Sequence, residues 1–316
     1  MCGIAGIHRM TDRPIKQLNV LATELLLAIE SRGRDATGYV AIDDDGSVQL
    51  EKAAMQASDF IFKKRRLRHD TRTVLLHTRF ATTGDRRSVA DAHPQSCGSV
   101  YCTHNGTVSN AEALFREWDL PRRARVDSEV IPALVSEASG WSDIGGALEL
   151  LEGSAAVALA DADRPQEVAL AVTRGFSIVY VEARDFIVWA STRRALLRAW
   201  RKAFGRRPKS ERAQRLAAGQ ILRVRDGHAV IESFTAAPVR TILTLPNELA
   251  WDDEDDEDDP PHAWADGAGI LLPSEERCDD CGGMTVMATY RWDSILCPDC
   301  YGLALDAFCD LTGSTA

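Results

Sequence analysis

The chain begins MCGIAG (residues 1–6), with a cysteine directly behind the first methionine and two glycines among small apolar residues. Cells usually remove the first methionine when the second residue is small, so we expect Cys2 to carry a free α-amino group beside its thiol. The run from Gly3 to His8 has the length and apolar content of a strand. This stretch therefore predicts a strand that starts at a reactive group.

Similar strand-like runs recur along the chain, with turn residues between them. Asp45-Gly46 and Asp226-Gly227 each separate two such runs and predict hairpins. Apolar residues at helical spacing predict helices over 15–30 and 127–138, the second interrupted by Pro132. We therefore expect an α+β domain of antiparallel sheets covered by helices, running to about Pro238. The further predicted strands cover residues 38–42, 74–78, 99–103, 154–160, 168–173, 177–181 and 187–190.

The length of 316 residues allows one large domain and a small one. No apolar run approaches the roughly 20 residues that a membrane span needs, and no basic-then-apolar leader precedes the first strand. These features predict a cytoplasmic protein that is not in a membrane. Without a secretory context for disulfides, we expect Cys97 and Cys102 to be buried as small apolar side chains.

The charge is concentrated in two segments. Of the net charge of −10, the run DDEDDEDD at 252–259 contributes −8, which leaves −2 for the rest of the chain. Like charges repel and stay solvated, and Pro260-Pro261 follows, so residues 239–269 are expected to be an acidic linker, with partner docking as the alternative. Residues 193–215 hold ten basic residues and one acidic residue. We interpret their first half as an amphipathic helix with a solvated basic face, with binding of nucleic acid or an acidic partner as the alternative.

The last part of the chain contains CDDC at 278–281 and CPDC at 297–300, separated by fifteen residues. Four thiolates from two such pairs can close a tetrahedral zinc shell, which makes a structural rather than a catalytic site. A redox pair is the alternative. Arg291 is the one basic residue from 278 to 316, against six aspartates, so nucleic acid binding is not expected. We therefore predict a zinc-ribbon-like module over 270–316, with these ligands: Cys278, Cys281, Cys297 and Cys300.

Polar motifs gather between the predicted strands of the large domain. They are SRGRDATGY at 31–39, HTRFATTGD at 77–85, HPQ at 93–95, HNGTVSN at 104–110 and DSE at 127–129. Together with Cys2, and in this order, they resemble the class II glutamine amidotransferase domain, an N-terminal nucleophile hydrolase fold. The resemblance covers roughly residues 2–235. It implies a four-layer αββα sandwich over residues 2–238, glutamine as substrate and no organic cofactor.

The chemistry of such a site can be assembled from these residues. The Cys2 thiol would attack the side-chain amide of glutamine, with its own α-amino group, of reference pKa about 7.7–8.0, moving the proton. The resulting oxyanion needs two donors, which the side-chain amide of Asn105 and the backbone N–H of Gly106 can supply.

The substrate-binding residues follow from the resemblance. It implies that Arg79 holds the α-carboxylate of glutamine, that Asp127 holds the α-ammonium, and that Thr82 completes the pocket. Arg32 and Asp35, in the segment RGRD, would shape the site around Cys2.

Phe80 and Thr83 stand where relatives commonly have a tryptophan and a histidine, which affects details of the pocket but not the reaction. The histidines of the motifs are expected to be structural: His77, His93 and His104.

The sequence shows none of the synthase motifs that such domains usually serve. We therefore expect a glutaminase that releases ammonia to an acceptor synthase on a separate chain. The alternative is a γ-glutamyl amide hydrolase that acts on a small peptide or metabolite. A third hypothesis is a binding protein in which Cys2 is idle.

Overall fold

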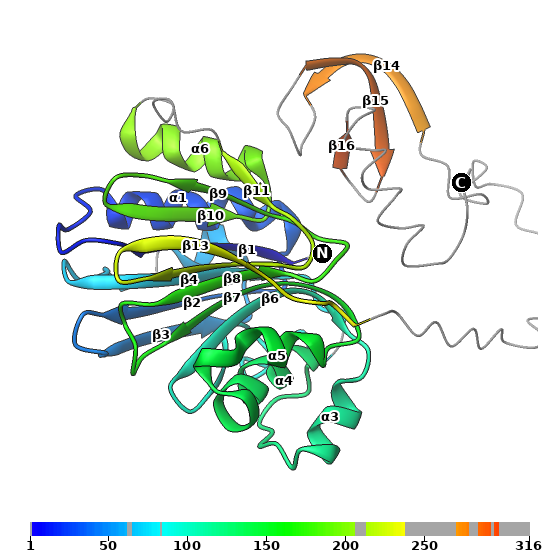
Figure 1. Cartoon of the computed structure of the whole chain (residues 1–316). Helices are drawn as coiled ribbons and strands as arrows, with labels where there is room; N and C mark the ends of the chain where they lie inside the picture. The colour runs from blue at the N-terminus through cyan, green and yellow to red at the C-terminus, as the bar shows by residue number, and fades with distance from the viewer. Residues whose placement is uncertain are drawn as a thin grey trace, which may run out of the picture. The chain divides into compact units, whose positions relative to one another are not determined.

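The computed structural model describes residues 2–61, 65–82, 84–205 and 213–237, and the backbone of three strands at 270–277, 284–291 and 294–296. The chain divides into two compact units, Met1–Pro238 and Val239–Ala316. The first unit contains two antiparallel sheets and the helices that cover them (Figure 1).

The first sheet has seven strands in the order β11-β9-β10-β1-β4-β2-β3. β1 lies in its interior, paired with β10 on one side and with β4 on the other. The start of β1 is therefore surrounded by other strands rather than exposed at a sheet edge. The strands are β1 (Gly3–Arg9), β2 (Ala36–Asp43), β3 (Val48–Ala53), β4 (Thr71–Arg79), β9 (Ile178–Glu182), β10 (Phe186–Ala190) and β11 (Gln214–Leu216).

The second sheet has six strands in the order β13-β12-β8-β7-β6-β5. β6 pairs with β7 along its whole length, but with β5 only through its first three residues. Along the rest of that side, β6 has no neighbouring strand among those described, so its backbone groups can bond to other parts of the molecule. The strands are β5 (Gln95–Cys97), β6 (Val100–Val108), β7 (Gly153–Asp161), β8 (Val168–Val172), β12 (Gln220–Arg225) and β13 (His228–Ser233).

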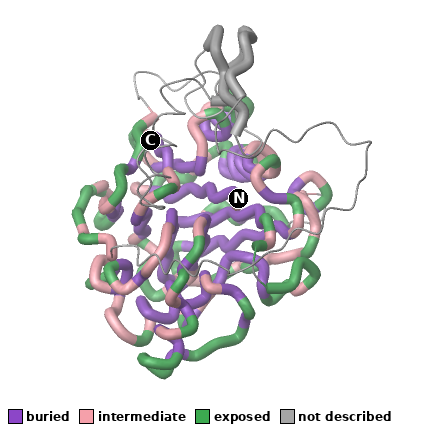
Figure 2. Tube along the Cα trace, turned by 90° about the vertical axis from the view of Figure 1, so that its right-hand side faces the viewer, coloured by how far each residue is buried: buried purple, intermediate pink, exposed green. Residues whose placement is uncertain are grey.

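Helices cover the outer face of each sheet, which gives four layers (Figure 1). One apolar cluster lies between the two sheets, and one lies under the helices on each side; Figure 2 shows the buried trace in these layers. On the first sheet lie α1 (Leu18–Ile29), α2 (Ala57–Phe60) and α6 (Arg193–Phe204), and on the second α3 (Ala111–Glu117), α4 (Val130–Ala133) and α5 (Ile144–Glu149). The short helical turns are η1 (Glu30–Arg32), η2 (Asp127–Glu129), η3 (Leu134–Ser139) and η4 (Trp141–Asp143).

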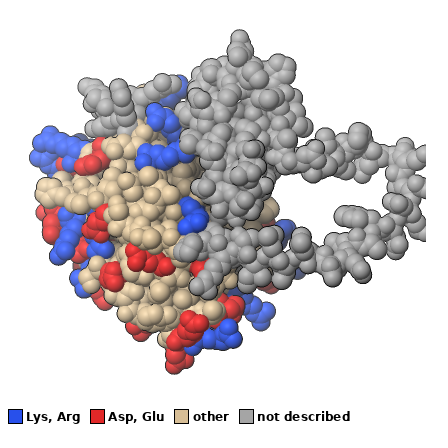
Figure 3. All heavy atoms as spheres, turned by 45° about the vertical axis from the view of Figure 1, so that its right-hand side comes forward, with Lys and Arg blue, Asp and Glu red and all other residues tan. Residues whose placement is uncertain are grey.

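The structure confirms the predicted α+β fold with antiparallel sheets. Both hairpins form, and Asp226 and Gly227 have φ angles of 51° and 75°, as a tight two-residue hairpin turn requires. Helix α6 buries five residues on one face and ends at Gly205, which has a φ angle of 70°. The basic residues of the helix are exposed or half-buried, on the side away from these five residues, so the prediction of an amphipathic helix with a basic face is also confirmed. Figure 3 shows how Lys and Arg side chains are distributed over one face of the molecule.

Of two local predictions, one was confirmed and one was wrong. Residues 127–139 are helical, in three consecutive pieces, η2, α4 and η3, with Pro132 inside α4 as the predicted interruption. Proline is tolerated there because it lies in the first turn of α4, where its missing N–H has no helical partner. The strand predicted to end at Thr103 continues to Val108, so the HNG motif lies within β6 and not in a turn.

The second unit contains a three-stranded antiparallel sheet, β14-β15-β16. The strands are β14 (Ile270–Arg277), β15 (Met284–Arg291) and β16 (Ser294–Leu296). The four predicted zinc ligands, at positions 278, 281, 297 and 300, lie outside the described residues. The acidic run at 252–259 also lies outside them. Among the helices that the structure describes, none is long and apolar enough to cross a membrane.

Candidate active site

Cys2 directly precedes β1 and is half-buried between neighbouring elements. The glycines around it are explained by close packing. A Cβ on Gly3 would lie 2.5 Å from Thr78 Oγ1 and 2.7 Å from Ile29 O, and one on Gly6 would lie 2.2 Å from Trp189 Cζ2. The MCGIAG sequence therefore lets β1 start directly against its neighbours, with Cys2 at its end.

Three contacts hold Cys2. Its backbone N–H donates to Asn105 Oδ1 at 3.0 Å, its Sγ lies 3.6 Å from the carbonyl oxygen of Phe80, and its carbonyl oxygen accepts from Arg32 Nε at 3.2 Å. Burial raises the pKa of the Cys2 thiol, and the backbone of Phe80 and the positive charges of neighbouring groups, Arg79 and Arg32 among them, oppose this rise. The thiol therefore rests protonated, and a base must take its proton before it can attack.

Asn105 lies on β6, and its side-chain oxygen is the atom bonded to Cys2. Because Oδ1 accepts that bond, the amide is oriented so that its Nδ2 donor remains for another acceptor beside the thiol. Asn105 thus connects the second sheet to the end of the first. It lies 103 residues from Cys2 in the chain.

Backbone groups of every second residue of β6 point away from β7. Ala155, opposite Gly106, exchanges its hydrogen bonds with Thr173 on the other side, so the N–H of Gly106 has no partner in β7. Two positions further along, the N–H of Val108 points the same way and donates to Asp127 Oδ2 at 2.7 Å. The N–H of Gly106 therefore points toward the side of β6 on which Asp127 lies.

The backbone at position 106 accommodates only glycine. Its φ angle is +150°, and a Cβ would lie 2.0 Å from the carbonyl oxygen of Ser154. The glycine of HNG is thus required by the backbone that presents this N–H.

Arg79 is the last residue of β4 and is almost completely buried, with 2% of its surface exposed. Its Nη1 donates to the carbonyl oxygen of Asp85 at 2.9 Å. Thr82 lies in the same loop after β4 and is exposed. The guanidinium is thus fixed beside Cys2, whereas the Thr82 side chain faces outward.

Arg32 and Asp35 contact the site at different points. Arg32 holds the carbonyl of Cys2 from η1. The backbone N–H of Asp35 donates to Arg79 O at 2.9 Å, and its Oδ2 accepts from the N–H of Ala81 at 2.7 Å. Asp35 therefore fastens the backbone on both sides of Phe80, whose carbonyl faces the Cys2 sulfur.

Three buried histidines lie behind these residues. The rings of His77 and His93 are stacked, with centroids 4.1 Å apart. His77 Nε2 contacts the carbonyl oxygen of His104 at 3.1 Å, and His104 Nδ1 contacts Ser128 Oγ at 2.8 Å. Burial lowers the pKa of His77 to about 3 and also lowers the pKa values of His93 and His104, so all three are neutral at neutral pH.

Several residues of the site lie within the quoted motifs, but the motifs do not indicate what these residues do. Phe80 acts through its backbone carbonyl, and Val108 through its N–H, so their side chains give no signal. Ser128 is within the DSE motif but was not singled out. Cys97 and Cys102 are buried, as predicted, and no disulfide forms among the described cysteines.

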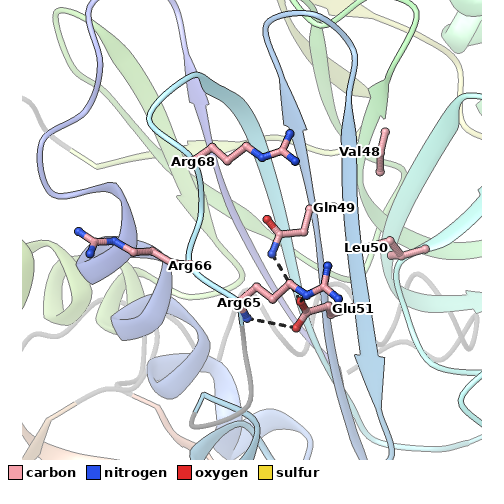
Figure 4. Close-up of a pocket in the computed structure, with 7 residues that line it drawn as sticks. All are labelled: Val48, Gln49, Leu50, Glu51, Arg65, Arg66 and Arg68. Atoms are coloured by element: carbon pink, nitrogen blue, oxygen red, sulfur yellow. Dashed lines mark hydrogen bonds and ion pairs between the residues drawn. The ribbon is translucent and has the colours of Figure 1, made fainter.

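A hollow of about 580 Å³ lies elsewhere, on the edge strand β3 and the following basic segment (Figure 4). Arg65 and Arg68 line it, but Arg65 Nε lies 3.4 Å from Glu51 Oε1 and Arg68 Nη1 lies 2.7 Å from Asp43 Oδ2. Two of its three arginines are thus neutralised, and no predicted site residue lines it. Within the part of the chain that is described, no group of three potential ligands could hold a metal ion.

Part of this chain is similar in sequence to known proteins. Residues 77–198 match a family described as glutamine amidotransferase domain. A 7-cyano-7-deazaguanine synthase of Saccharolobus solfataricus is 28% identical over 181 residues, which are 54% of this chain and 38% of that protein. A glutamine–fructose-6-phosphate aminotransferase (isomerizing) of Sulfurisphaera tokodaii is 32% identical over 167 residues, 50% of this chain and 28% of that protein. This chain thus spans well under half the length of these relatives.

A solved structure supports the same fold. The glutamine phosphoribosylpyrophosphate amidotransferase of B. subtilis superposes with a TM-score of 0.58 at 20% identity, covering 74% of this chain and 49% of that one. At this identity the likeness concerns the fold of two antiparallel sheets with helices. Together with the sequence matches, it supports a class II glutamine amidotransferase domain in this chain, and with it an enzyme.

Proposed function

We propose that this protein hydrolyses the side-chain amide of glutamine through a thioester on Cys2 and releases ammonia for an acceptor synthase on a separate chain. The observation that carries the proposal is the 3.0 Å contact between the Cys2 nitrogen and Asn105 Oδ1. This contact supports the proposal because it joins Cys2, the proposed nucleophile, to the side-chain amide proposed as an oxyanion donor.

The proposed reaction uses the groups around Cys2 in two steps. After removal of Met1, the free α-amino group takes the proton of the Sγ, and the sulfur attacks the amide carbon of glutamine. Asn105 Nδ2 and the N–H of Gly106 donate to the oxyanion, and the α-ammonium returns the proton to the leaving nitrogen, which departs as ammonia. Water then hydrolyses the glutamyl thioester to glutamate and restores the thiol.

The charged ends of glutamine have complementary partners in this proposal. The buried guanidinium of Arg79 would pair with the α-carboxylate, and the half-buried carboxylate of Asp127 with the α-ammonium. Thr82, in the exposed loop after β4, would contact the substrate only if this loop folds over it. Arg32 and Asp35 would hold Cys2 and the Phe80 carbonyl in place.

The proposal is tested by mass spectrometry of the purified protein before and after incubation with 6-diazo-5-oxo-norleucine, a glutamine mimic that alkylates the nucleophile. We expect loss of Met1 and one adduct, mapped to Cys2, and no adduct in Cys2→Ala. A retained Met1 without an adduct would refute the proposal and favour the binding protein. Rates with glutamine and with γ-glutamyl dipeptides then separate a glutaminase from a γ-glutamyl amide hydrolase.

We also propose that residues 270–316 bind one structural zinc ion through Cys278, Cys281, Cys297 and Cys300. The spacing of the two cysteine pairs supports this. The cytoplasm, where thiols stay reduced, is the proposed location of both sites. Metal analysis should give about one zinc per chain, and Cys278→Ser should lose it, whereas Cys97→Ser should retain it. Equal zinc in both variants would refute the site.

A further inference from the structure

His104 contacts all three elements that carry the proposed glutamine-binding groups. Its own strand, β6, continues directly into Asn105 and Gly106. Its backbone carbonyl accepts from His77, which lies two residues before Arg79 on β4. Its side chain contacts Ser128 in η2, next to Asp127. The imidazole is 2% exposed, so this position is fixed by packing on every side.

The contacts indicate which atom donates and which accepts in the two hydrogen bonds of Ser128. Ser128 Oγ lies 2.8 Å from His104 Nδ1 and 3.4 Å from Asp127 Oδ1. A carboxylate only accepts hydrogen bonds, so the Ser128 hydroxyl donates to Asp127. The same hydroxyl oxygen must then accept from His104, which requires a proton on Nδ1.

The remaining nitrogen of His104 lies toward the carbonyl oxygen of Ser154. Nε2 is buried and makes no hydrogen bond of good geometry among the described residues. Against the lowering by burial, the Ser154 carbonyl raises the pKa of the imidazole and is the acceptor that the opposite tautomer would use, so the position of the proton is what the tautomer measurement decides.

We propose that His104 and Ser128 are positioning residues, which orient the Asp127 carboxylate toward the α-ammonium of the substrate through the chain His104 Nδ1–H, Ser128 O–H and Asp127 Oδ1. The second oxygen of Asp127 is held by the N–H of Val108 from the same strand. Both carboxylate oxygens are therefore tied to β6, the strand that bears the oxyanion donors. This inference rests on the proposed function.

Loss of the Ser128–Asp127 hydrogen bond should weaken only the binding of the α-ammonium of glutamine. Ser128→Ala removes the bond to Asp127 Oδ1 but leaves Cys2, Asn105 and Arg79 in place. A hydrogen bond to a charged group corresponds to about ten-fold or more in affinity, and the 3.4 Å length places this one at the lower end. We expect KM for glutamine to rise about ten-fold, with kcat changed less than three-fold.

A substrate without the α-amino group distinguishes positioning from general damage. The test compares glutamine with 4-carbamoylbutanoate, which retains the carboxylate and the amide. Ser128→Ala should raise KM for glutamine but leave kcat/KM for 4-carbamoylbutanoate within two-fold of the unmodified protein. Ser128→Thr, which keeps a hydroxyl, should restore part of the affinity for glutamine. An equal loss on both substrates, or no change in KM, would overturn the inference.

The matched control is Ser191→Ala. Ser191 is also a buried serine, with 3% of its surface exposed, and its hydroxyl has no hydrogen-bond partner in the described part of the chain. We expect both substrates to behave as in the unmodified protein. If this control also raised KM for glutamine, loss of any buried hydroxyl would explain the effect and the inference would fail.

The tautomer is measurable without turnover. In protein labelled with ¹⁵N-histidine, with His104→Gln used to assign the signal, we expect a proton on Nδ1 and none on Nε2. A proton on Nε2 alone would overturn the inference even if the enzyme is active. Failure of the unmodified protein to hydrolyse glutamine would instead refute the proposed function, and the tautomer would still decide whether His104 donates to Ser128.

Discussion

Gly33→Ala is expected to reduce glutaminase activity about 100-fold. The backbone of Gly33 is extended, with a φ angle of −170°, so alanine meets no conformational strain of its own. The added Cβ would, however, lie 2.3 Å from the carbonyl carbon of Arg79, whereas ordinary contact begins at 3.4 Å. The segments must separate by 3.4 − 2.3 = 1.1 Å, and no side-chain rotation can relieve a clash with backbone atoms.

This displacement falls on the segment that carries Arg79 and the Phe80 carbonyl, both of which influence the Cys2 thiol. A misplacement of about 1 Å can reduce catalysis about 100-fold. Overpacking of this kind destabilises by about 1–3 kcal/mol. Stretching the 2.9 Å bond from Asp35 N to Arg79 O adds about 1 kcal/mol. We therefore expect a loss of about 3 kcal/mol in the free energy of unfolding.

The assays are kcat/KM for glutamine and urea unfolding, with Gly145→Ala as the control. A Cβ on Gly145, in helix α5, would meet its nearest neighbours at 3.7 and 3.8 Å, which is ordinary contact. This variant should keep full activity and gain up to about 1 kcal/mol of stability from helix propensity. If Gly33→Ala kept activity within three-fold and its stability within about 0.5 kcal/mol, the close approach would have no functional importance and the reasoning would be refuted.

Three further predictions concern separate features. Asn105→Ala should lower kcat by about 10²–10³-fold through loss of an oxyanion donor, which single-turnover kinetics would show; an unchanged kcat would contradict that role. Asp44→Ala should destabilise by about 3 kcal/mol, since it leaves two arginines, each 2% exposed, without their shared carboxylate; unfolding within 1 kcal/mol of the unmodified protein would argue against it. His8 and His77 have pKa values lowered to about 3, so below about pH 6.5 the unfolded chain binds protons that the folded protein does not. Stability should therefore fall by about 1.4 kcal/mol per pH unit for each histidine between pH 6.5 and 5, and equal urea midpoints at pH 7 and 5 would contradict this.

The strands and hairpins were predictable because short apolar runs separated by Asp-Gly pairs are local signals. The same local reasoning failed at HNG, where the motif looks like a turn but continues a strand. The backbone there follows Gly106 because the carbonyl of Ser154 approaches too closely for any side chain. That carbonyl lies on β7, so a reading of neighbouring residues could not include it.

The residues of the candidate site were predictable from their motifs, but their contacts were not. Cys2 and Asn105 stand 103 residues apart, and His104 and Ser128 stand 24 apart. Which atom of Asn105 contacts the nucleophile, and which hydroxyl supports Asp127, depend on the pairing of strands from two sheets. A sequence motif names the residue type and leaves this geometry undefined.

The interior position of β1 also sets an order of events during synthesis. Its partner β4 ends at Arg79, but its other partner, β10, is complete only at Ala190. At 5–20 residues per second, the ribosome needs about 10–40 s to reach that point. During this interval the N-terminus of the nascent chain cannot yet be enclosed on both sides. A peptidase that removes Met1 would therefore meet an accessible chain end during this interval, before both neighbours of β1 have been synthesised.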